Sequence, residues 1–539
     1  MLPSLLTTLL LLVSSTFGAP ASIVSTAFKS PSDDPWAILC KLSIVRLIAN
    51  GLCPRQSSSS VVSVSTPAGI AEGAVDLSGV NRFAVRYASA ARWAESQVST
   101  TWALPNGATN ASGLPLVCPQ QGVDDSTFSE DCLSMLIYVP DSFSPSSSVP
   151  IFMWVHGGSF IEGSATDAGL DGSNLALATQ SIVVVIQYRL GALGLMVPDG
   201  STNLALKDVI NALTFVNQNI AAFGGDNSRV TIAGQSSGAT MIRSLLAVPS
   251  ASHLFQSAIL QSDPMDYGFQ NSACQNALSV DAILNAQGTL FNEASNLDAS
   301  AGAGEPLRPV NDGTLITSPL DSTAAFPSVN KPILVSTVLD EAALTIGSEF
   351  SSALPEDEFL PICQASLGDS RAAAVANASF YKPVSVDGSE DARQQLQLLG
   401  TDYVWRCSSW TFARNWISNG GSAYVGRYSV GATYPGNEEV SFCTEPGAVC
   451  HQDDIEIVFG TVPNPNAAQS ALTKEMQARY KAFMLTGSPN VPAYPPWTEA
   501  TSSDVHALNL GGSGEVAAGS CDPSFWGAAV PYDYQVFGI

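Results

Sequence analysis

Short apolar runs without polar alternation recur from residue 134 to residue 262, and a helical pattern separates two of them. Such runs predict strands that are buried on both faces, as in a parallel sheet. Apolar residues along ALKDVINALTFVNQNIAAF recur at helical spacing. This alternation predicts the α/β class, with a mostly parallel twisted sheet, helices on both faces and large insertions at 263–330 and 345–420. The predicted strands are SMLIYVP (134–140), PIFMWVH (150–156), SIVVVIQY (181–188), RVTIAG (229–234), FQSAILQS (255–262) and PILVSTVLD (332–340).

The stretch TIAGQSSGAT lies where a predicted strand meets a helix predicted at 238–248. A serine on a sharp strand-to-helix turn has a strained backbone, projects its hydroxyl above the sheet and needs small neighbours. Because the glycines stand at 234 and 238, the middle of G-x-S-x-G is Ser236 and not Ser237. A chain with 43 glycines offers this motif by chance as well. Its position between a strand and a helix favours a nucleophile over a simple turn.

A serine nucleophile needs a base, and the chain has four histidines. In hydrolases built around such a turn, the acid and then the histidine follow the serine along the chain, which excludes His156. His253 follows the serine too closely to leave room for the acid and its strand. His506 lies in an apolar alternation typical of a packed strand. His451, in the loop segment AVCHQDD, is therefore the predicted base.

The acid of such a triad holds the imidazole tautomer and stabilises the imidazolium. In ILVSTVLDEAALTIG, Asp340 and Glu341 follow a late predicted strand, and their positions alone do not separate them. Three further acids lie too close to the predicted base in sequence to reach around its ring. We expect these three to form a solvated or helix-start cluster: Asp453, Asp454 and Glu456.

The segment MWVHGGSF places glycines directly after a predicted strand and upstream of the serine. Glycines in this position are typical of an oxyanion loop, whose backbone N–H groups face the developing negative charge. A tight turn is the simpler interpretation of a Gly-Gly pair. Ser159 stands where such loops often have a third glycine, and its backbone N–H can still donate. The N–H of Ser237, which follows the nucleophile, would complete the site.

Taken together, these blocks resemble the type-B carboxylesterase/lipase family, which includes the cholinesterases, and they are closest in style to its secreted fungal members. The resemblance extends from about residue 61 to the C-terminus. It implies an α/β-hydrolase fold and a triad of Ser236, Glu341 and His451. It also implies three backbone N–H donors for the oxyanion: Gly158, Ser159 and Ser237. The matching blocks are SEDCL (129–133), HGGSF (156–160), QYRLGALG (187–194), LALKDVINAL (204–213), FGGDNSRVTIAGQSSGA (223–239), LDEA (339–342) and AVCHQDDIEIVFG.

The resemblance further implies a disulfide between Cys118 and Cys132. In the cholinesterases this loop is long and carries a tryptophan that holds the substrate cation, and in the family's fungal lipases it forms the lid. Here the loop is short and has no tryptophan. It therefore favours an esterase that acts on soluble or shorter-chain esters. Neighbouring cysteines make two further candidate pairs, Cys443 with Cys450 and Cys40 with Cys53.

The first residues, MLPSLLTTLLLLVSSTFGAP, combine an apolar run with small residues, which predicts a secretory signal peptide at 1–19. We expect an N-terminal extension with a Ser-rich linker at 20–60 and a single hydrolase domain at 61–539. Ten cysteines fit an extracellular, oxidising compartment. The sequons at Asn110 and Asn377 are candidate glycosylation sites.

Aspartate and glutamate number 47 against 22 lysines and arginines, for a net charge of −25. Such a charge repels nucleic acid and anionic membranes. After the leader, no stretch reaches the ~18 apolar residues of a membrane span, and no Cys/His cluster has zinc spacing. We therefore expect no cofactor, no metal, no nucleic-acid partner and no stable membrane insertion. The expected partner is a small-molecule or lipid ester.

The predicted function is secreted hydrolysis of carboxylic esters through an acyl-enzyme. One alternative is an interfacially activated lipase that acts on long-chain acylglycerols or sterol esters. The other is a non-catalytic cholinesterase-like binding protein. Neither the acyl and alcohol groups of the substrate nor the oligomeric state follows from the sequence.

Overall fold

The structure is a computed structural model, and it describes residues 61–75, 79–124, 126–195, 201–265, 280, 283–285, 287–288, 307–317, 325–383, 385–386 and 389–529. The predicted signal peptide, the extension at 20–60 and the Cys40–Cys53 pair lie outside these residues. Among the described helices, none has the length and apolar character needed to cross a bilayer.

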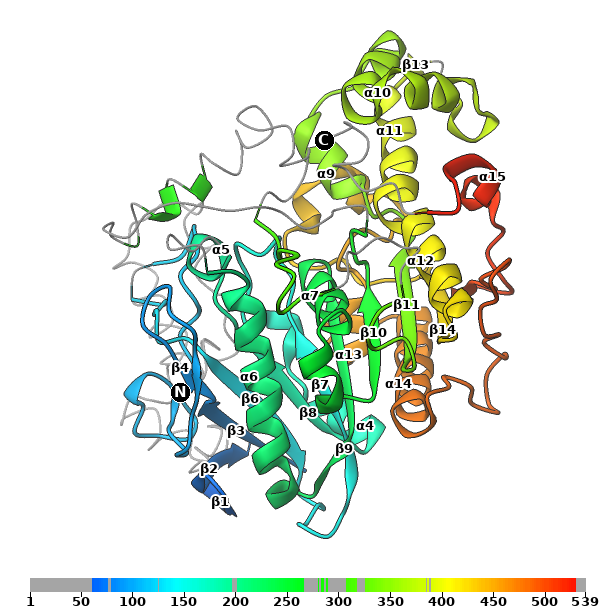
Figure 1. The fold of residues 1–539 in the computed structure, drawn as a ribbon. Helices are drawn as coiled ribbons and strands as arrows, with labels where there is room; N and C mark the ends of the chain where they lie inside the picture. Colours follow the sequence, from blue (N-terminus) through cyan, green and yellow to red (C-terminus); the bar gives the residue numbers. More distant parts are fainter. Residues whose placement is uncertain are drawn as a thin grey trace, which may run out of the picture. The chain divides into compact units, whose positions relative to one another are not determined.

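The described strands form one large sheet of eleven strands and two small two-stranded ribbons (Figure 1). The strands from β1 to β8 in the spatial order pair antiparallel, and those from β8 to β15 pair parallel. The predicted α/β class with a mostly parallel sheet is confirmed. In spatial order, the large sheet consists of β1 (Val61–Thr66), β2 (Gly69–Val75), β3 (Val80–Arg86), β6 (Ser134–Pro140), β8 (Ile182–Ile186), β7 (Val149–Val155), β9 (Gly225–Gln235), β10 (Ser257–Gln261), β11 (Pro332–Val338), β14 (Ser422–Tyr428) and β15 (Leu508–Leu510). The ribbons are β4 (Ala88–Ser89) with β5 (Gln97–Val98) and β12 (Ser385–Val386) with β13 (Ser389–Glu390).

Helices cover both faces of the sheet (Figure 1). Alternate residues of a strand point to opposite faces, so Met153 and Val155 of β7 join the core with α6, α7 and α12, whereas Phe152 and Trp154 join the core with α4, α13 and α14. Two hydrophobic cores therefore hold the sheet from either side. The helices are α4 (Ser173–Thr179), α5 (Gly191–Gly194), α6 (Leu204–Asn219), α7 (Ser237–Leu246), α9 (Ala343–Glu349), α10 (Phe359–Asn377), α11 (Ala392–Gly400), α12 (Cys407–Ser418), α13 (Ile455–Phe459), α14 (Ala467–Thr486) and α15 (Pro523–Trp526), with a π-helical turn η9 (Thr401–Arg406) between α11 and α12.

Each predicted strand is present; β6 has the predicted ends, and the ends of the others are shifted. The largest shift is in β9, which begins at Gly225 instead of residue 229 and pairs with β7 from Val149 onward. The added residues are partly exposed, so the apolar pattern that predicted the strand misses them. Strand β9 ends at Gln235, one residue before the predicted nucleophile.

Two buried ion pairs join the sheet to the helices around this point. Arg189, after β8, contacts Asp208 of α6 at 2.7 Å, and Arg243 of α7 contacts Asp263, after β10, at 2.8 Å. All four side chains are nearly or fully buried. Losing one partner would leave a buried charge unpaired, which is strongly destabilising. Helices α6 and α7 are thereby held to the carboxyl edge of the sheet.

Three disulfides occur among the described residues. Cys118 is bonded to Cys132 and Cys443 to Cys450, as the sequence suggested. The third joins Cys407 of α12 to Cys521 across 114 residues, and local sequence spacing gave no signal for it.

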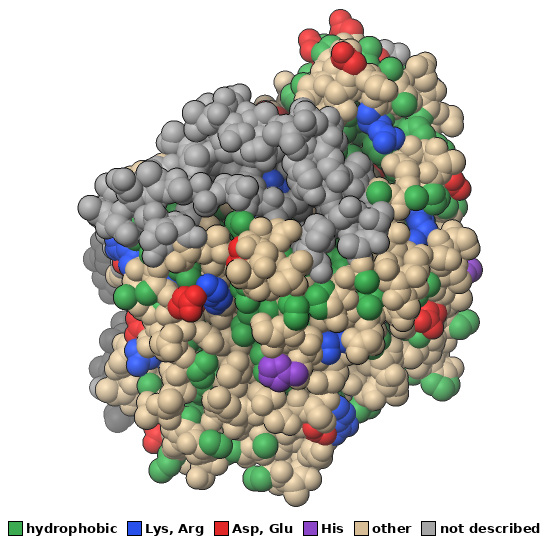
Figure 2. Space-filling model, viewed as in Figure 1, with side chains coloured by type: hydrophobic (Ala, Val, Ile, Leu, Met, Phe, Trp, Pro, Cys, Tyr) green, Lys and Arg blue, Asp and Glu red, His purple; other side chains and the backbone are tan. Residues whose placement is uncertain are grey.

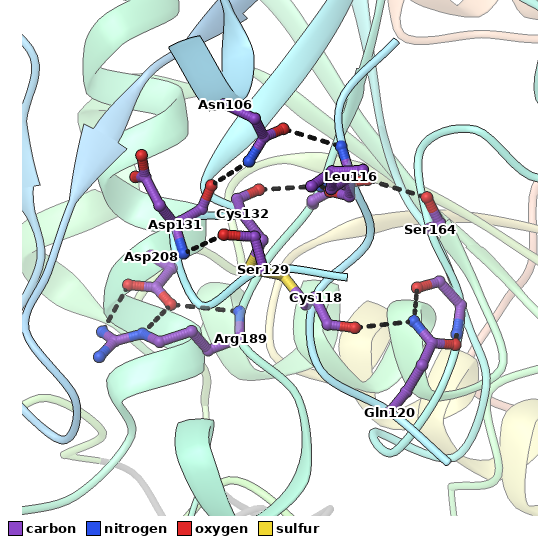
Figure 3. The surroundings of a disulfide bond; sticks show 12 residues. Asn106, Leu116, Cys118, Gln120, Ser129, Asp131, Cys132, Ser164, Arg189 and Asp208 are labelled. Atoms are coloured by element: carbon purple, nitrogen blue, oxygen red, sulfur yellow. Dashed lines mark hydrogen bonds and ion pairs between the residues drawn. A yellow bond between two sulfur atoms is a disulfide. The ribbon is translucent and has the colours of Figure 1, made fainter. Parts of the chain in front are cut away.

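The Cys118–Cys132 loop contacts Gly163, three residues after the predicted oxyanion segment, and Figure 3 shows the surroundings of the disulfide. The amide nitrogen of Gln120 donates to the carbonyls of Cys118, at 3.1 Å, and Gly163, at 3.0 Å. Its oxygen accepts from the Gly163 N–H at 3.0 Å. The short loop therefore packs as a brace beside the sheet.

Candidate active site

Ser236 occupies the turn between β9 and α7. Its φ of 55° and ψ of −129° lie in a strained region for a residue with a side chain. The turn is held on both sides, because the Ser236 N–H donates to the Gln261 carbonyl at 2.9 Å and its own carbonyl accepts from the Thr240 N–H at 3.0 Å. This is the geometry of a nucleophile elbow.

The glycines around the serine are required by close backbone packing. A Cβ on Gly234 would lie 2.6 Å from the Gly238 backbone, and a Cβ on Gly238 would lie 2.2 Å from the Val155 carbonyl oxygen. Helix α7 begins so close to β9 and β7 that larger residues cannot fit. The spacing of the motif is thus explained by packing.

Glu341 and His451 meet although 110 residues separate them. The Glu341 Oε2 lies 2.6 Å from the His451 Nδ1, and its Oε1 accepts from the Val338 N–H at 2.8 Å. Glu341 is fully buried. An ionised carboxylate only accepts hydrogen bonds, so opposite such a carboxylate the imidazole carries its proton on Nδ1 and its lone pair on Nε2, as the predicted base requires.

Asp340 forms different contacts from those of Glu341, the next residue in the sequence. Its side chain accepts from the Val449 N–H and from the Gln397 amide, each at 3.1 Å, and its N–H donates to the Val449 carbonyl at 2.9 Å. These bonds join the loop of the acid to the loop of the histidine. Asp340 therefore braces the site, while Glu341 faces the imidazole.

Of the expected solvated or helix-start cluster, the helix start is confirmed for Asp454 and Glu456, which lie at the start of α13, but all three acids are buried and not solvated. Asp454 lies against Gln261 of β10, and Asp453 lies against the loop after β14, where it accepts from the Tyr434 N–H. Burial raises the pKa of Asp453 to about 6 and that of Asp454 to about 7. Asp453 accepts from the Cys450 N–H at 2.8 Å, and Asp454 accepts from the Gln261 amide at 2.5 Å. Asp453 shapes the histidine loop, and Asp454 lies behind the Glu341–His451 pair.

The hydroxyl of the predicted nucleophile is not joined to the predicted base. Among the contacts of the described residues, no hydrogen bond links the Ser236 Oγ to His451. Instead, the Gln235 Nε2 lies 3.1 Å from the His451 Nε2. The structure therefore places Glu341 beside the His451 Nδ1 and Gln235 beside the His451 Nε2.

The predicted oxyanion loop has a backbone that suits its glycine. Gly158 has a φ of 109°, and a Cβ there would lie 2.3 Å from the Glu162 carbonyl oxygen. Ser159 follows at a φ of 49°, so the loop accommodates its side chain. Ser237 is the first residue of α7, where backbone N–H groups have no acceptor within the helix.

A cavity of about 330 Å³ opens beside the oxyanion loop. Its wall combines the loop glycines with polar side chains such as Gln120 and Glu162 and with apolar ones such as Leu170 and Ile455. Burial raises the pKa of Asp167, a further lining residue, to about 6. The carboxyl and amide groups of this wall can bind polar groups of a ligand.

The other histidines lie apart from the Glu341–His451 pair. His156 is buried against Tyr188, with ring centroids 4.7 Å apart, and burial lowers its pKa to about 4. His253 is exposed. The expectation of a packed strand at His506 is wrong, because this residue precedes β15 with a φ of 48° and its Nδ1 lies 3.3 Å from Glu515.

Sequence reasoning missed several residues around His451. The Trp405 ring, on the π-helical turn η9, lies 5.5 Å from the imidazole, and the Asn437 amide donates to the His451 carbonyl at 2.8 Å. Neither Trp405 nor Asn437 belongs to a motif. Gln235 belongs to the G-x-S-x-G motif, and its position next to Ser236 was the one signal in the sequence that could have indicated it. Among the described residues, the group with metal-like spacing contains Cys407 and Cys521, whose sulfurs are joined as a disulfide.

The strained serine turn, the acid after a late parallel strand and the following histidine loop define an α/β-hydrolase. A solved PNB esterase superposes with a TM-score of 0.65 at 23% identity, covering 83% of this chain and 95% of its own. The model of the carboxylesterase family matches residues 60–270 and 268–523. The chain belongs to the carboxylesterase family, and it is a carboxylic ester hydrolase.

Two curated relatives illustrate the similarity. A probable N-octanoylanthranilate hydrolase of Rhodococcus erythropolis is 30% identical over 353 residues, which span 62% of this chain and 69% of the relative. The para-nitrobenzyl esterase of Bacillus subtilis (strain 168) is 44% identical over 139 residues, which span 25% of this chain and 28% of the relative. The second match is strong but local.

Proposed function

We propose that this protein is a secreted serine esterase, in which Ser236 is the nucleophile, His451 the base and Glu341 the acid. The observation that carries the proposal is the buried 2.6 Å contact between Glu341 and His451, in the chain order that the strained Ser236 turn requires. The same proposal includes a signal peptide at 1–19 and a single domain at 61–539. It also includes glycans on Asn110 and Asn377, which are exposed.

The reaction follows from these positions. Ser236 Oγ attacks the ester carbonyl while His451 Nε2 takes its proton, and Glu341 stabilises the imidazolium. The backbone N–H groups of Gly158, Ser159 and Ser237 hold the oxyanion. The imidazolium then protonates the leaving alcohol. Water, deprotonated by the same imidazole, releases the acid from the acyl-enzyme.

Soluble esters of short acids are the proposed substrates. The Cys118–Cys132 loop spans only 14 residues, and the cavity beside the oxyanion loop has a largely polar wall. One cited relative is named a para-nitrobenzyl esterase and the other a probable N-octanoylanthranilate hydrolase. These observations favour an esterase over an interfacially activated lipase.

The test compares S236A with the wild type on para-nitrophenyl acetate. We expect kcat to fall at least about 10⁴-fold, because the nucleophile is lost while the fold is kept. S244A is the matched control, since Ser244 is a buried serine of the same helix whose hydroxyl bonds to the Thr240 carbonyl. Turnover by S236A near the wild-type rate would rule out the proposed nucleophile. An unlabelled Ser236 after treatment with a fluorophosphonate would favour the non-catalytic binding protein.

A further inference from the structure

Gln235 lies directly against the base although the proposed reaction gives it no part. It is the last residue of β9, fully buried, and pairs in parallel register with Gln261 of β10. Its Nε2 is 3.1 Å from the His451 Nε2. Its Oε1 is buried and has no hydrogen-bond partner among the described residues. The contact with the imidazole is therefore the polar contact that orients this amide.

Which group donates the hydrogen bond between Gln235 and His451 follows from the position of the imidazole proton. Glu341 accepts the Nδ1 proton of His451 at 2.6 Å, so the ring carries its lone pair on Nε2. An amide that faces a lone pair must present its NH₂ group, because its oxygen would be repelled. Gln235 therefore donates to the nitrogen that the reaction needs as the base.

The other side of the amide faces the oxyanion loop. A Cβ on Gly157 would lie 2.9 Å from the Gln235 Oε1 and 3.1 Å from the Ser236 Cβ. The absence of a side chain at Gly157 thus makes room for the amide beside the nucleophile. Gln235 fills the space between the oxyanion loop and the imidazole.

We propose that Gln235 is a positioning residue that holds the resting His451 through its Nε2 and must release it before Ser236 can transfer its proton. An imidazole nitrogen has a single lone pair in the ring plane, so the amide and the serine hydroxyl compete for it. The inference rests on the proposed function, since it takes His451 as the base for Ser236.

The amide also affects how readily the base is protonated. A donor to Nε2 stabilises the neutral imidazole and not the imidazolium, so it lowers the pKa of the ring. Among the described residues, the carboxyl groups near His451 act in the opposite direction, and they come from the loop after β11 and from the turn before α13: Glu341, Asp453 and Asp454. On the side of η9, the ring meets Trp405, while Asp402 and Arg406 pair with each other at 2.6 Å.

Two substitutions separate the effects of the amide. Q235M keeps an unbranched side chain of similar length and removes the donor, and Q235E keeps the shape and adds a negative charge. Q477M is the matched control, because Gln477 is a buried amide that donates to the Val458 carbonyl, away from His451. The measurement is kcat/KM on para-nitrophenyl acetate from pH 5 to 9, which reports the pKa of the free enzyme.

We expect Q235M to raise the plateau of kcat/KM about threefold to tenfold, the value of one neutral hydrogen bond, and to move the acid limb about half a pH unit upward. Q235E should move the acid limb further upward, because its carboxylate stabilises the imidazolium. Q477M should leave the limb in place.

An acid limb that stays at the wild-type position in both variants overturns the proposal, and so does a lower plateau without a shift, which is the mark of a merely structural role. Labelling by a fluorophosphonate tells the two hypotheses apart. If the wild type takes up no probe at Ser236, the proposed nucleophile fails. If the wild type is labelled and the pH profiles of the variants coincide with its own, the role of Gln235 alone fails.

Discussion

At the residue scale, adjacent carboxylates have separate tasks. Glu341 points to His451 and is fully buried, whereas Asp340 bonds to the Val449 backbone and the Gln397 amide. The residues alone left this choice open, and the family resemblance selected Glu341. The contact with the imidazole supports that selection, because the acid must hold the Nδ1 proton.

E341Q tests this division of tasks. The amide keeps the shape but cannot stabilise the imidazolium, so we expect kcat to fall about 10³–10⁴-fold with little change in KM. D340N is the neighbouring control. It should lower the melting temperature and leave kcat within about tenfold of wild type. Equal losses of kcat in the two variants would contradict the assignment of Glu341.

At the element scale, the two disulfides that close short loops stabilise different parts of the molecule. The Cys118–Cys132 loop braces the sheet beside Gly163, while Cys450 directly precedes His451. The separations are 14 and 7 residues, so each bridge restricts the unfolded chain to a similar extent. The two bridges should therefore be similar in stability and different in activity.

We expect C118S/C132S to lower the free energy of unfolding by about 3 kcal/mol and to change kcat little. C443S/C450S should lower it by a similar amount and also reduce kcat about tenfold or more, because the histidine loop loses its anchor. Urea unfolding and para-nitrophenyl acetate turnover measure the two effects. A C443S/C450S variant with wild-type kcat would mean that the loop is held by Asp340 and Asp453 without the bridge.

At the scale of the whole molecule, buried carboxyl groups link stability to pH. Burial raises the pKa of Asp167 and Asp453 to about 6 and that of Asp454 to about 7. Between about pH 4 and pH 7, the folded state therefore holds protons that the unfolded state has released, and stability falls as pH rises. Asp226 acts in the opposite sense, because hydrogen bonds from Ser228 lower its pKa to about 2, but its contribution is lost only in acid.

We expect the free energy of unfolding to decrease from pH 5 to pH 8 by an amount on the order of a few kcal/mol. The net charge of −25 adds self-repulsion in the same direction. D454N should flatten the curve, whereas D226N should lower it by a constant amount above about pH 4 and leave the stability in stronger acid nearly unchanged. Thermal unfolding at a series of pH values measures this, and a melting temperature that rises from pH 5 to pH 8 would contradict it.

The charge of the molecule has no single focus on the face drawn in Figure 2, where basic and acidic side chains are scattered among polar and apolar ones. Charged residues make up only 13% of the chain. Because the chain has a large negative net charge, added salt should screen its self-repulsion and weaken the decline in stability between pH 5 and pH 8.

The sequence by itself determined the local features. The apolar runs predicted the inner strands, and the glycine spacing assigned the elbow to Ser236. Chain order then selected His451 from four histidines. The inner strands and the strained turn at Ser236 are present in the structure, because strand burial and backbone crowding leave their pattern within about ten neighbouring residues. The role of His451 stays a prediction.

Only the tertiary structure decided which residues distant in sequence contact one another and which polar groups are shielded from water. Gln235 reaches His451 across 216 residues, and Cys407 reaches Cys521 across 114. Asp454, expected in a solvated or helix-start cluster, does begin α13 but is fully buried behind Glu341. Contacts of this range depend on how the whole sheet is assembled, and desolvation depends on every element packed around a group. Neither a long-range contact nor the desolvation of a group is encoded in the residues that neighbour the group in the sequence.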